Sequence, residues 1–307
     1  MEILFTLFSI LIFPAGLSLI LVGMFYEWID RKLVARFQNR IGPRWFQPFA
    51  DMVKLSSKEQ ITPRLAQRAL FFGLPVLALS GALTSALYVP LMGLVPTHSF
   101  PGDLIVSIYL LSLLTMSIGL AGWNTSSRFS LVGATRALTQ MFAYEAPFLL
   151  ALLGPALVAG SWQINEINTY AAGHWLILSQ PVGFLVALVG LMGKLQLPPF
   201  DAPEAETEIV AGALTDYSGR GLAIFEMGKS VELVVGLTLV AAFYLGGLGG
   251  FLPFLLKTVF LLLVMSILQS VLTRLRIDQT VGMWWRFGAL LALVQILILV
   301  LLKGWLA

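Results

Sequence analysis

The sequence predicts an all-α polytopic membrane protein that forms a single membrane domain over residues 1–307. Two observations support this fold class. Hydrophobic residues make up 58% of the chain and charged residues only 11%, and the mean hydropathy of +0.88 lies far above that of soluble domains. The apolar residues also form runs close to the roughly 20 residues that a helix needs to cross the hydrocarbon core.

We expect about eight transmembrane helices. The first apolar run has no basic residues before it and no small-residue cleavage pattern after it, which favours a retained helix over a signal peptide. No convincing internal repeat is present, so a transporter built from two similar halves is not indicated. The eight windows cover residues 3–26, 70–95, 103–122, 139–160, 175–195, 222–245, 251–273 and 283–306.

The basic residues predict the orientation. Of 19 Lys and Arg residues, nine lie between the first two spans and seven more lie in or beside other loops of the same side. The positive-inside rule therefore places these loops in the cytoplasm and both termini on the outer side. Topology alone can explain this excess, and specific recognition of lipid or of a partner is the alternative. The seven basic residues in or beside the other loops of this side are Arg128, Arg136, Lys194, Arg220, Arg274, Arg276 and Arg286.

The composition excludes several kinds of redox centre in this chain. It has no cysteine, so disulfides, thiolate zinc sites and cysteine-ligated iron–sulfur clusters cannot form. The two histidines, His98 and His174, share no local spacing that would favour a metal site. We therefore expect no metal ion and no cofactor bound by this chain, and any redox centre belongs to another subunit.

A long cytoplasmic loop at about residues 27–68 is the first candidate interaction surface. Apolar residues alternate with charges, and Phe49, Met52, Val53 and Ser56 have the spacing of a short amphipathic helix at the interface. Loops of this length are usually functional or covered by a partner. The residues predicted to dock a partner are Asp30, Arg31, Arg36, Arg40, Arg44, Asp51 and Lys54, with Arg128 and Arg136 from the next loop.

A second candidate is the acidic loop at about residues 198–221, between two predicted spans. It contains Asp201, Glu204, Glu206, Glu208 and Asp216. In a helix begun after Pro203, Glu204 and Glu208 would share one face, where like charges repel and favour proton uptake. A solvated acidic loop bound to a basic partner surface is the alternative.

Four residues of the predicted ion path lie inside predicted spans. Glu145 lies about 13 Å beyond Arg136 along its helix, where an isolated carboxylate is costly. We expect Gln140 or Tyr144 as its local partner and favour a proton-relay role over a purely structural bond. Glu226, Lys229 and Glu232 are spaced by three, so Lys229 can pair with either acid. This stripe is either a hydrated proton path or a structural ion-pair ladder.

Three segments resemble, in order, the cytoplasmic signatures of the complex I subunit 1 (NuoH-like) family. They are FQNRIGP with QPFADMVKLSSKEQITP, then GWNTSSRFSLVGATRALTQMFAYEAP, then PPFDAPEAETEIVAGALTDYSG. The family includes the corresponding subunits of group 4 energy-converting membrane-bound hydrogenases. The resemblance implies an eight-helix fold, contact with the subunit that carries the terminal iron–sulfur cluster, and a polar channel leading to antiporter-like subunits.

Departures from the quinone-reducing members favour the hydrogenase-like branch. Lys194 and Leu197 stand where those members carry a glutamate and an arginine, and the loop after Gly42-Pro43 is shortened. Asp30 replaces the usual glutamate, and Lys229 replaces another. The resemblance then implies a peripheral arm with an iron–sulfur subunit and a large hydrogenase-like (49-kDa-like) subunit. The partner subunits would hold the iron–sulfur cluster and a nickel–iron centre, and a quinone is possible but not favoured.

The sequence thus predicts a non-catalytic subunit of a multisubunit ion-translocating oxidoreductase in a bacterial or archaeal cytoplasmic membrane. It would dock the redox arm and link electron transfer to H⁺ or Na⁺ translocation; its partners include lipid but no nucleic acid. One alternative is the quinone-binding subunit of an oxidoreductase that passes electrons from NADH, ferredoxin or F420H2 to quinone. Another is a stand-alone secondary ion transporter. The predicted ion path comprises Glu145, Asp201, Glu204, Glu206, Glu208, Asp216, Glu226, Lys229 and Glu232.

Overall fold

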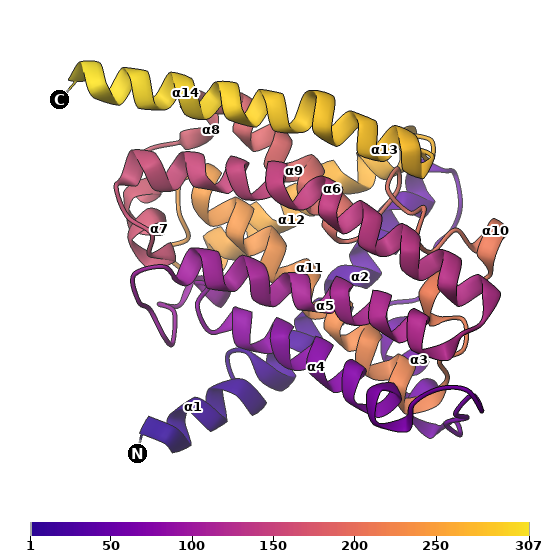
Figure 1. Ribbon diagram of the computed structural model, residues 1–307. Helices are drawn as coiled ribbons and strands as arrows, with labels where there is room; N and C mark the ends of the chain where they lie inside the picture. Colours follow the sequence, from indigo (N-terminus) through magenta and orange to yellow (C-terminus); the bar gives the residue numbers. More distant parts are fainter. Residues whose placement is uncertain (1, 307) are drawn as a thin grey trace.

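The computed structural model describes residues 2–306, which form a bundle of α-helices without a strand (Figure 1). The side chains of residues 2–5, 206 and 303–306 lie outside this description. The long helices are α2 (Gly16–Phe37), α4 (Arg68–Ala86), α5 (Asp103–Thr125), α6 (Arg128–Ala159), α11 (Gly219–Tyr244), α12 (Phe251–Val271) and α14 (Ala289–Leu306). Shorter helices are α1 (Glu2–Leu11), α3 (Gln47–Ser57), α7 (Ile164–Gly173), α8 (Leu176–Ser179), α9 (Pro181–Lys194), α10 (Glu206–Ile209) and α13 (Ile277–Met283). Three single turns complete the chain, η1 (Leu91–Gly93), η2 (Gly212–Leu214) and the π-helical η3 (Trp284–Gly288).

The chain is a multi-pass membrane protein. Within residues 2–306, six helical segments are long and apolar enough to cross a bilayer. The first of them joins α1 to α2, and the last joins α13, η3 and α14. They are Thr6–Phe37, Arg68–Gly93, Asp103–Thr125, Arg128–Ala159, Phe251–Val271 and Ile277–Leu302.

The remaining two of the eight predicted spans correspond to α9 and α11. The helix α9 has only 14 residues, about 21 Å at 1.5 Å per residue, which is shorter than the hydrocarbon core. In α11, every residue from 230 to 244 is buried by the surrounding helices, so this apolar run contacts protein. The expected eight spans are therefore met by six segments that have the length and hydropathy of a membrane span.

The central helix α11 packs on α2, α4 and α12, and α6 is flanked by α5, α9 and α14. Close approach of α2 to α11 depends on Gly23. A Cβ at this position would lie 2.7 Å from the carbonyl carbon of Ser230, far inside van der Waals contact. The glycine therefore sets the spacing of the two helices that carry most of the charged site.

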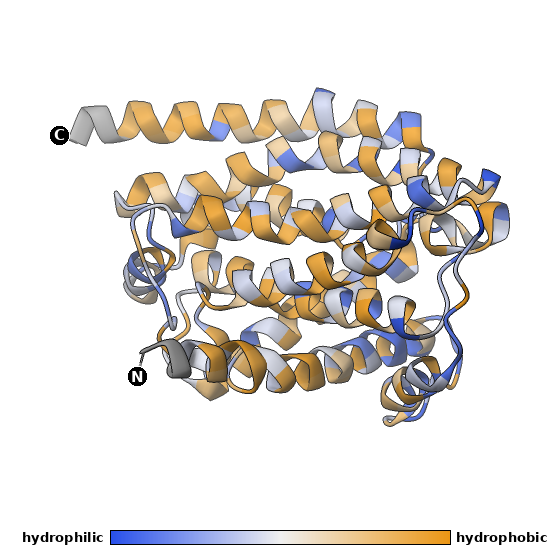
Figure 2. Cartoon of the chain, turned by 60° about the horizontal axis from the view of Figure 1, so that its bottom comes forward, coloured by the Kyte–Doolittle hydropathy of each residue, from blue (hydrophilic) through white to orange (hydrophobic). Residues whose placement is uncertain are grey.

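The loops rich in charged residues gather at one end of the bundle. In Figure 1, α3, α10 and α13 lie at this end, whereas α1 begins and α14 ends at the opposite end. Figure 2 shows hydrophilic residues concentrated in the loops at its right and hydrophobic residues along the long helices. The charged end corresponds to the side that the sequence predicts to be cytoplasmic.

Candidate functional site

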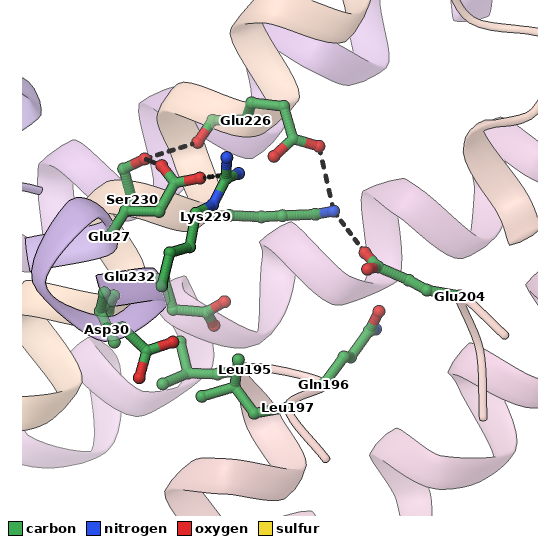
Figure 3. A pocket seen from close by; sticks show the side chains of 12 residues that line it. Glu27, Asp30, Leu195, Gln196, Leu197, Glu204, Glu226, Lys229, Ser230 and Glu232 are labelled. Atoms are coloured by element: carbon green, nitrogen blue, oxygen red, sulfur yellow. Dashed lines mark hydrogen bonds and ion pairs between the residues drawn. The ribbon is translucent and has the colours of Figure 1, made fainter. Parts of the chain in front are cut away.

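A polar cavity of about 280 Å³ lies between α2, α11 and the segment that follows α9. Seven of its twelve lining residues are ionisable, and the neighbouring apolar wall consists of Leu195, Leu197 and Leu233. Figure 3 shows the acidic side chains pointing toward the same space from different elements. The ionisable residues are Glu27, Asp30, Arg31, Glu204, Glu226, Lys229 and Glu232.

Lys229 links two predicted acids at the mouth of this cavity. Its ammonium donates to Glu226, 3.2 Å away and one helical turn earlier on α11, and also to Glu204. Glu204 comes from the acidic loop, so this pair ties the loop to α11. The side chain of Lys229 is 25% exposed and that of Glu204 is 44% exposed, so the pair lies where the cavity meets solvent.

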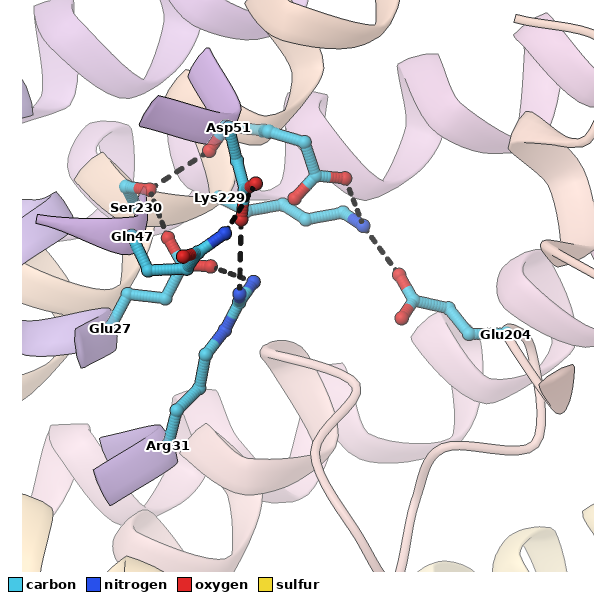
Figure 4. A network of polar contacts seen from close by, with 8 residues as sticks. Glu27, Arg31, Gln47, Asp51, Glu204, Lys229 and Ser230 are labelled. Carbon is cyan, nitrogen blue, oxygen red and sulfur yellow. Dashed lines mark hydrogen bonds and ion pairs between the residues drawn. The ribbon is translucent and has the colours of Figure 1, made fainter. Parts of the chain in front are cut away.

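Glu27 and Arg31 continue the network along α2. Arg31 pairs with Glu27 one turn before it and lies 3.9 Å from Asp51 of α3. The hydroxyl of Ser230 lies 3.2 Å from Glu27 Oε2 and 3.0 Å from the backbone oxygen of Glu226, which connects the two helices (Figure 4). A second cavity of about 390 Å³ shares five lining residues with the first, which are Glu27, Arg31, Glu204, Glu226 and Lys229.

Asp30 was predicted to dock a partner, but its carboxylate faces the cavity and α12. Oδ1 accepts hydrogen bonds from Ser266 Oγ (2.6 Å) and Gln269 Nε2 (3.1 Å). Asp51 accepts a hydrogen bond from Gln47 Nε2 within α3. Asp30 thus bonds α12 and Asp51 lies near Arg31 at the surface. The predicted basic docking residues Arg36, Arg40, Arg44, Lys54 and Arg128 are exposed.

An ion pair deeper in the bundle was missed by sequence reasoning. Lys194 and Glu232 are each only 1% exposed, and Lys194 Nζ lies 3.8 Å from Glu232 Oε1. The same ammonium donates to Ser112 Oγ (2.9 Å) and lies over the ring of Tyr144. The spacing on the helix had suggested Lys229 as a partner of Glu232. In the structure Glu232 pairs with Lys194 instead. A lysine at the end of an apolar helix usually reaches toward water, so only the tertiary structure reveals this burial.

Glu145 is half-buried on α6, next to Tyr144. It lies within electrostatic range of Lys194. Within the described residues, its Oε1 has no hydrogen-bond partner. The expected partner Gln140 donates its amide hydrogens to the backbone oxygens of Gly193 and Phe200 at 3.0 and 2.8 Å.

The acids of the acidic loop diverge to different partners. Helix α10 spans only Glu206–Ile209, so Glu204 and Glu208 do not share a helix face, and the expectation that they do is wrong. The turn starts at Glu206 because the backbone at Ala205 departs from helical geometry. Glu208 accepts a hydrogen bond from Arg136 Nη1 at 2.8 Å, which lowers the pKa of this carboxyl below its usual 4.5.

Two further acids fix the ends of the acidic loop. Asp201 accepts hydrogen bonds from Arg274 Nε, at 2.8 Å, and from Arg274 Nη2. Asp216 accepts a hydrogen bond from Ser130 Oγ at 3.1 Å. Glu206 was also predicted to belong to the ion path, but its side chain lies outside the part of the structure that is described. Within them, no group of three His, Cys, Asp or Glu residues could hold a metal ion.

Comparisons with known proteins identify the family. The family model described as NADH dehydrogenase matches residues 9–300. The chain belongs to the NADH dehydrogenase subunit 1 family. This confirms the resemblance seen in the three sequence segments. A subunit of the NADH-quinone oxidoreductase from Carboxydothermus hydrogenoformans is 33% identical, with 91% of this chain and 84% of that protein covered. The corresponding NADH-quinone oxidoreductase subunit from Geobacter sulfurreducens is 34% identical, with 92% and 91% covered.

A solved structure shares the fold. A chain in the structure of the membrane-bound sulfane sulfur reductase, an archaeal respiratory membrane complex, matches with a TM-score of 0.85 at 22% identity. The match covers 97% of this chain and 99% of that chain. The family assignment makes this chain a membrane subunit of the complex I-like respiratory type.

Proposed function

We propose that this subunit docks a peripheral redox arm on its charged end and couples electron transfer to the translocation of H⁺ or Na⁺. The partners would be an iron–sulfur subunit and a large hydrogenase-like subunit on that end, with antiporter-like subunits beside it in the membrane. Iron–sulfur and nickel–iron centres would belong to these partners. The chain itself would carry charge changes along its acids and lysines, without a redox step of its own.

The observation that carries this proposal is the pair of charge clusters inside an apolar bundle. The outer cluster is Glu204, Lys229, Glu226, Glu27 and Arg31, and the inner cluster is Lys194 and Glu232. Fully buried ionisable residues such as the inner pair are costly inside a membrane and usually mark ion or proton pathways. A packing role alone would be served more cheaply by apolar side chains.

The distances allow a charge change in one group to be felt by the next. At the 3.2 Å between Lys229 and Glu226, the interaction is about 5 kcal/mol with an effective dielectric constant of about 20. Protonation of Glu204 would leave Lys229 paired with Glu226 alone and so alter the field at Glu27. A movement of the acidic loop caused by the redox arm can start this sequence, because Glu204 belongs to that loop.

The names of the relatives support a second candidate, quinone binding between this subunit and its neighbour. The cavity argues against it in this chain. Seven of its twelve lining residues are ionisable, whereas ligand pockets are mostly apolar. A lining dominated by charged groups suits water and protons better than a quinone ring. Reduction of quinone by the purified complex, blocked by inhibitors that bind the quinone site, would favour this second candidate.

The test of coupling is the variant Glu145→Gln in the intact complex, reconstituted in sealed vesicles. Glutamine keeps the shape and hydrogen bonding of the side chain but cannot carry a proton. We expect normal assembly and normal electron transfer from an artificial donor, with a reduced ratio of ions moved to electrons transferred. The matched control is Glu166→Gln, an exposed acid on α7 outside both clusters. An unchanged ratio for Glu145→Gln would show that the path does not use this residue.

Docking is tested separately by charge reversal on the exposed basic residues. Arg40→Glu combined with Arg128→Glu should prevent copurification of the peripheral arm, because both charges lie on the surface proposed to receive it. Retention of a fully assembled complex would argue against docking through these residues.

The proposed topology follows the sequence prediction: α9 and α11 also cross the membrane, and both termini lie on the outer side.

A further inference from the structure

A third cavity, separate from the charge clusters, lies beside α2 where the loop 41–46 folds back on the helix. It is a shallow groove, wide open to the surroundings, with a volume of about 610 Å³. The two cavities described above contain several carboxylates, whereas no acidic residue lines this one. The lining residues are Phe25, Trp28, Lys32, Pro43, Arg44, Trp45 and Phe46.

The cavity wall is held by hydrogen bonds between the loop and α2. Lys32 Nζ donates to the backbone oxygen of Ile41 at 2.9 Å, and Trp28 Nε1 donates to that of Pro43 at 3.3 Å. Gly42 has a φ of +70°, and a Cβ there would lie 3.0 Å from Cβ of Ala35. Glycine thus allows both the turn and the close approach, so the cavity is formed before any ligand binds.

Four aromatic rings and two cations meet at this position. Phe25 and Trp28 lie with ring centroids 5.2 Å apart, and Trp45 and Phe46 form an edge-on pair at 5.9 Å. Trp45 is 63% exposed and Phe25 is 41% exposed, which leaves apolar surface uncovered in this chain. Aromatic rings beside Lys and Arg at the end of a membrane span are typical of the level of lipid head groups.

We infer that this cavity binds an anionic phospholipid of the surrounding bilayer. Its phosphate would be held by the guanidinium of Arg44, which suits phosphate geometry, together with the ammonium of Lys32. The acyl chains would lie along Phe25, Trp45 and Phe46. Because two basic side chains and no acidic residue line the cavity, an anionic lipid gains electrostatic binding energy that a zwitterionic lipid does not.

A lipid at this site would act on the charge clusters through α3. This helix begins at Gln47, directly after Phe46, and its Asp51 lies 3.9 Å from Arg31. The lipid would fix the start of α3 and thereby the position of Asp51. This inference does not depend on the proposed coupling function, since binding is measured without turnover.

The experiment uses the intact complex in phosphatidylcholine nanodiscs that contain phosphatidylglycerol with a photoreactive group on its acyl chain. After illumination, mass spectrometry locates the labelled peptides. We expect labelling within residues 25–46, reduced about five-fold by Arg44→Gln, because one basic residue at the surface contributes about that factor. Trp45→Ala should also reduce labelling, since it removes part of the wall that contacts the acyl chain.

The matched control is Arg64→Gln, an exposed basic residue of the same long loop that lines none of the three cavities. Equal losses for Arg64→Gln and Arg44→Gln would indicate diffuse attraction and overturn the specific site. Equal labelling by a photoreactive phosphatidylcholine would do the same. Labelling elsewhere on the chain but none within residues 25–46 would also overturn the proposed site.

Discussion

Replacing Lys194 by methionine tests whether the inner ion pair is a coupled charge unit. Methionine has a similar length but no charge, so Glu232 would remain buried without its counter-ion. For charges 3.8 Å apart, the lost attraction is about 4 kcal/mol at an effective dielectric constant of about 20. This agrees with the 3–5 kcal/mol or so usually lost when one partner of a buried pair is removed. The thermal midpoint of the complex should fall by roughly 5–10 °C.

The assay is a double-mutant cycle on the purified complex. Glu232→Gln alone should also destabilise it, because Lys194 is then left buried and unpaired. The double variant should recover most of the loss, with a coupling free energy of about 4 kcal/mol between the two positions. If the effects of the two single substitutions simply add in the double variant, the side chains do not interact and our interpretation of the pair is wrong.

Three further predictions concern helix packing, the acidic loop and topology. Gly23→Ala should lower the thermal midpoint by separating α2 from α11, at a cost of about 1–3 kcal/mol; Gly73→Ala, where a Cβ meets nothing within 4 Å, is the control, and equal midpoints would contradict the packing argument. The carboxyl of Glu208 should titrate below pH 4.5 in infrared difference spectra, and its band should vanish in Glu208→Gln. Because its pKa is lowered, the pair with Arg136 stabilises the loop above pH 4.5, and this stabilisation is lost as the pH falls through the lowered pKa. A single cysteine at Val95 should react with an impermeant maleimide in intact cells, whereas one at Ser56 should react only after permeabilisation; the chain has no cysteine of its own, and the opposite pattern would reverse the predicted orientation.

Sequence patterns predicted the local features of this protein well. Helical spacing around Phe49 indicated the amphipathic helix that is present as α3, and the spacing of three between Glu226 and Lys229 indicated a pair that the structure contains. Both depend on residues close in the chain, where helix geometry fixes the neighbours. Glu27 and Arg31 have the same kind of spacing, so this pair was within reach of the sequence.

The partners that lie far apart in the chain could not be predicted. Glu232 pairs with Lys194, and Glu204 with Lys229, only because α9, α11 and the acidic loop meet in three dimensions. Of the eight predicted spans, six are matched by segments of sufficient length and hydropathy, and the crossing of the membrane by α9 and α11 stays a prediction. Hydropathy does not distinguish an apolar helix that faces lipid from one that is covered by other helices, and α11 is covered.

The difference in exposure between the two charge clusters gives them different sensitivities to ionic strength. The pairs of the acidic loop are open to solvent, with Glu208 51% exposed and Glu204 44% exposed. At about 1 M salt the Debye length falls to about 3 Å, so dissolved ions weaken these contacts, whereas buried charges are screened far less. Lys194 and Glu232 keep their attraction under the same conditions. Salt therefore loosens the acidic loop and leaves the inner pair intact, so the two sets of ion pairs can be distinguished in one preparation by raising the salt concentration.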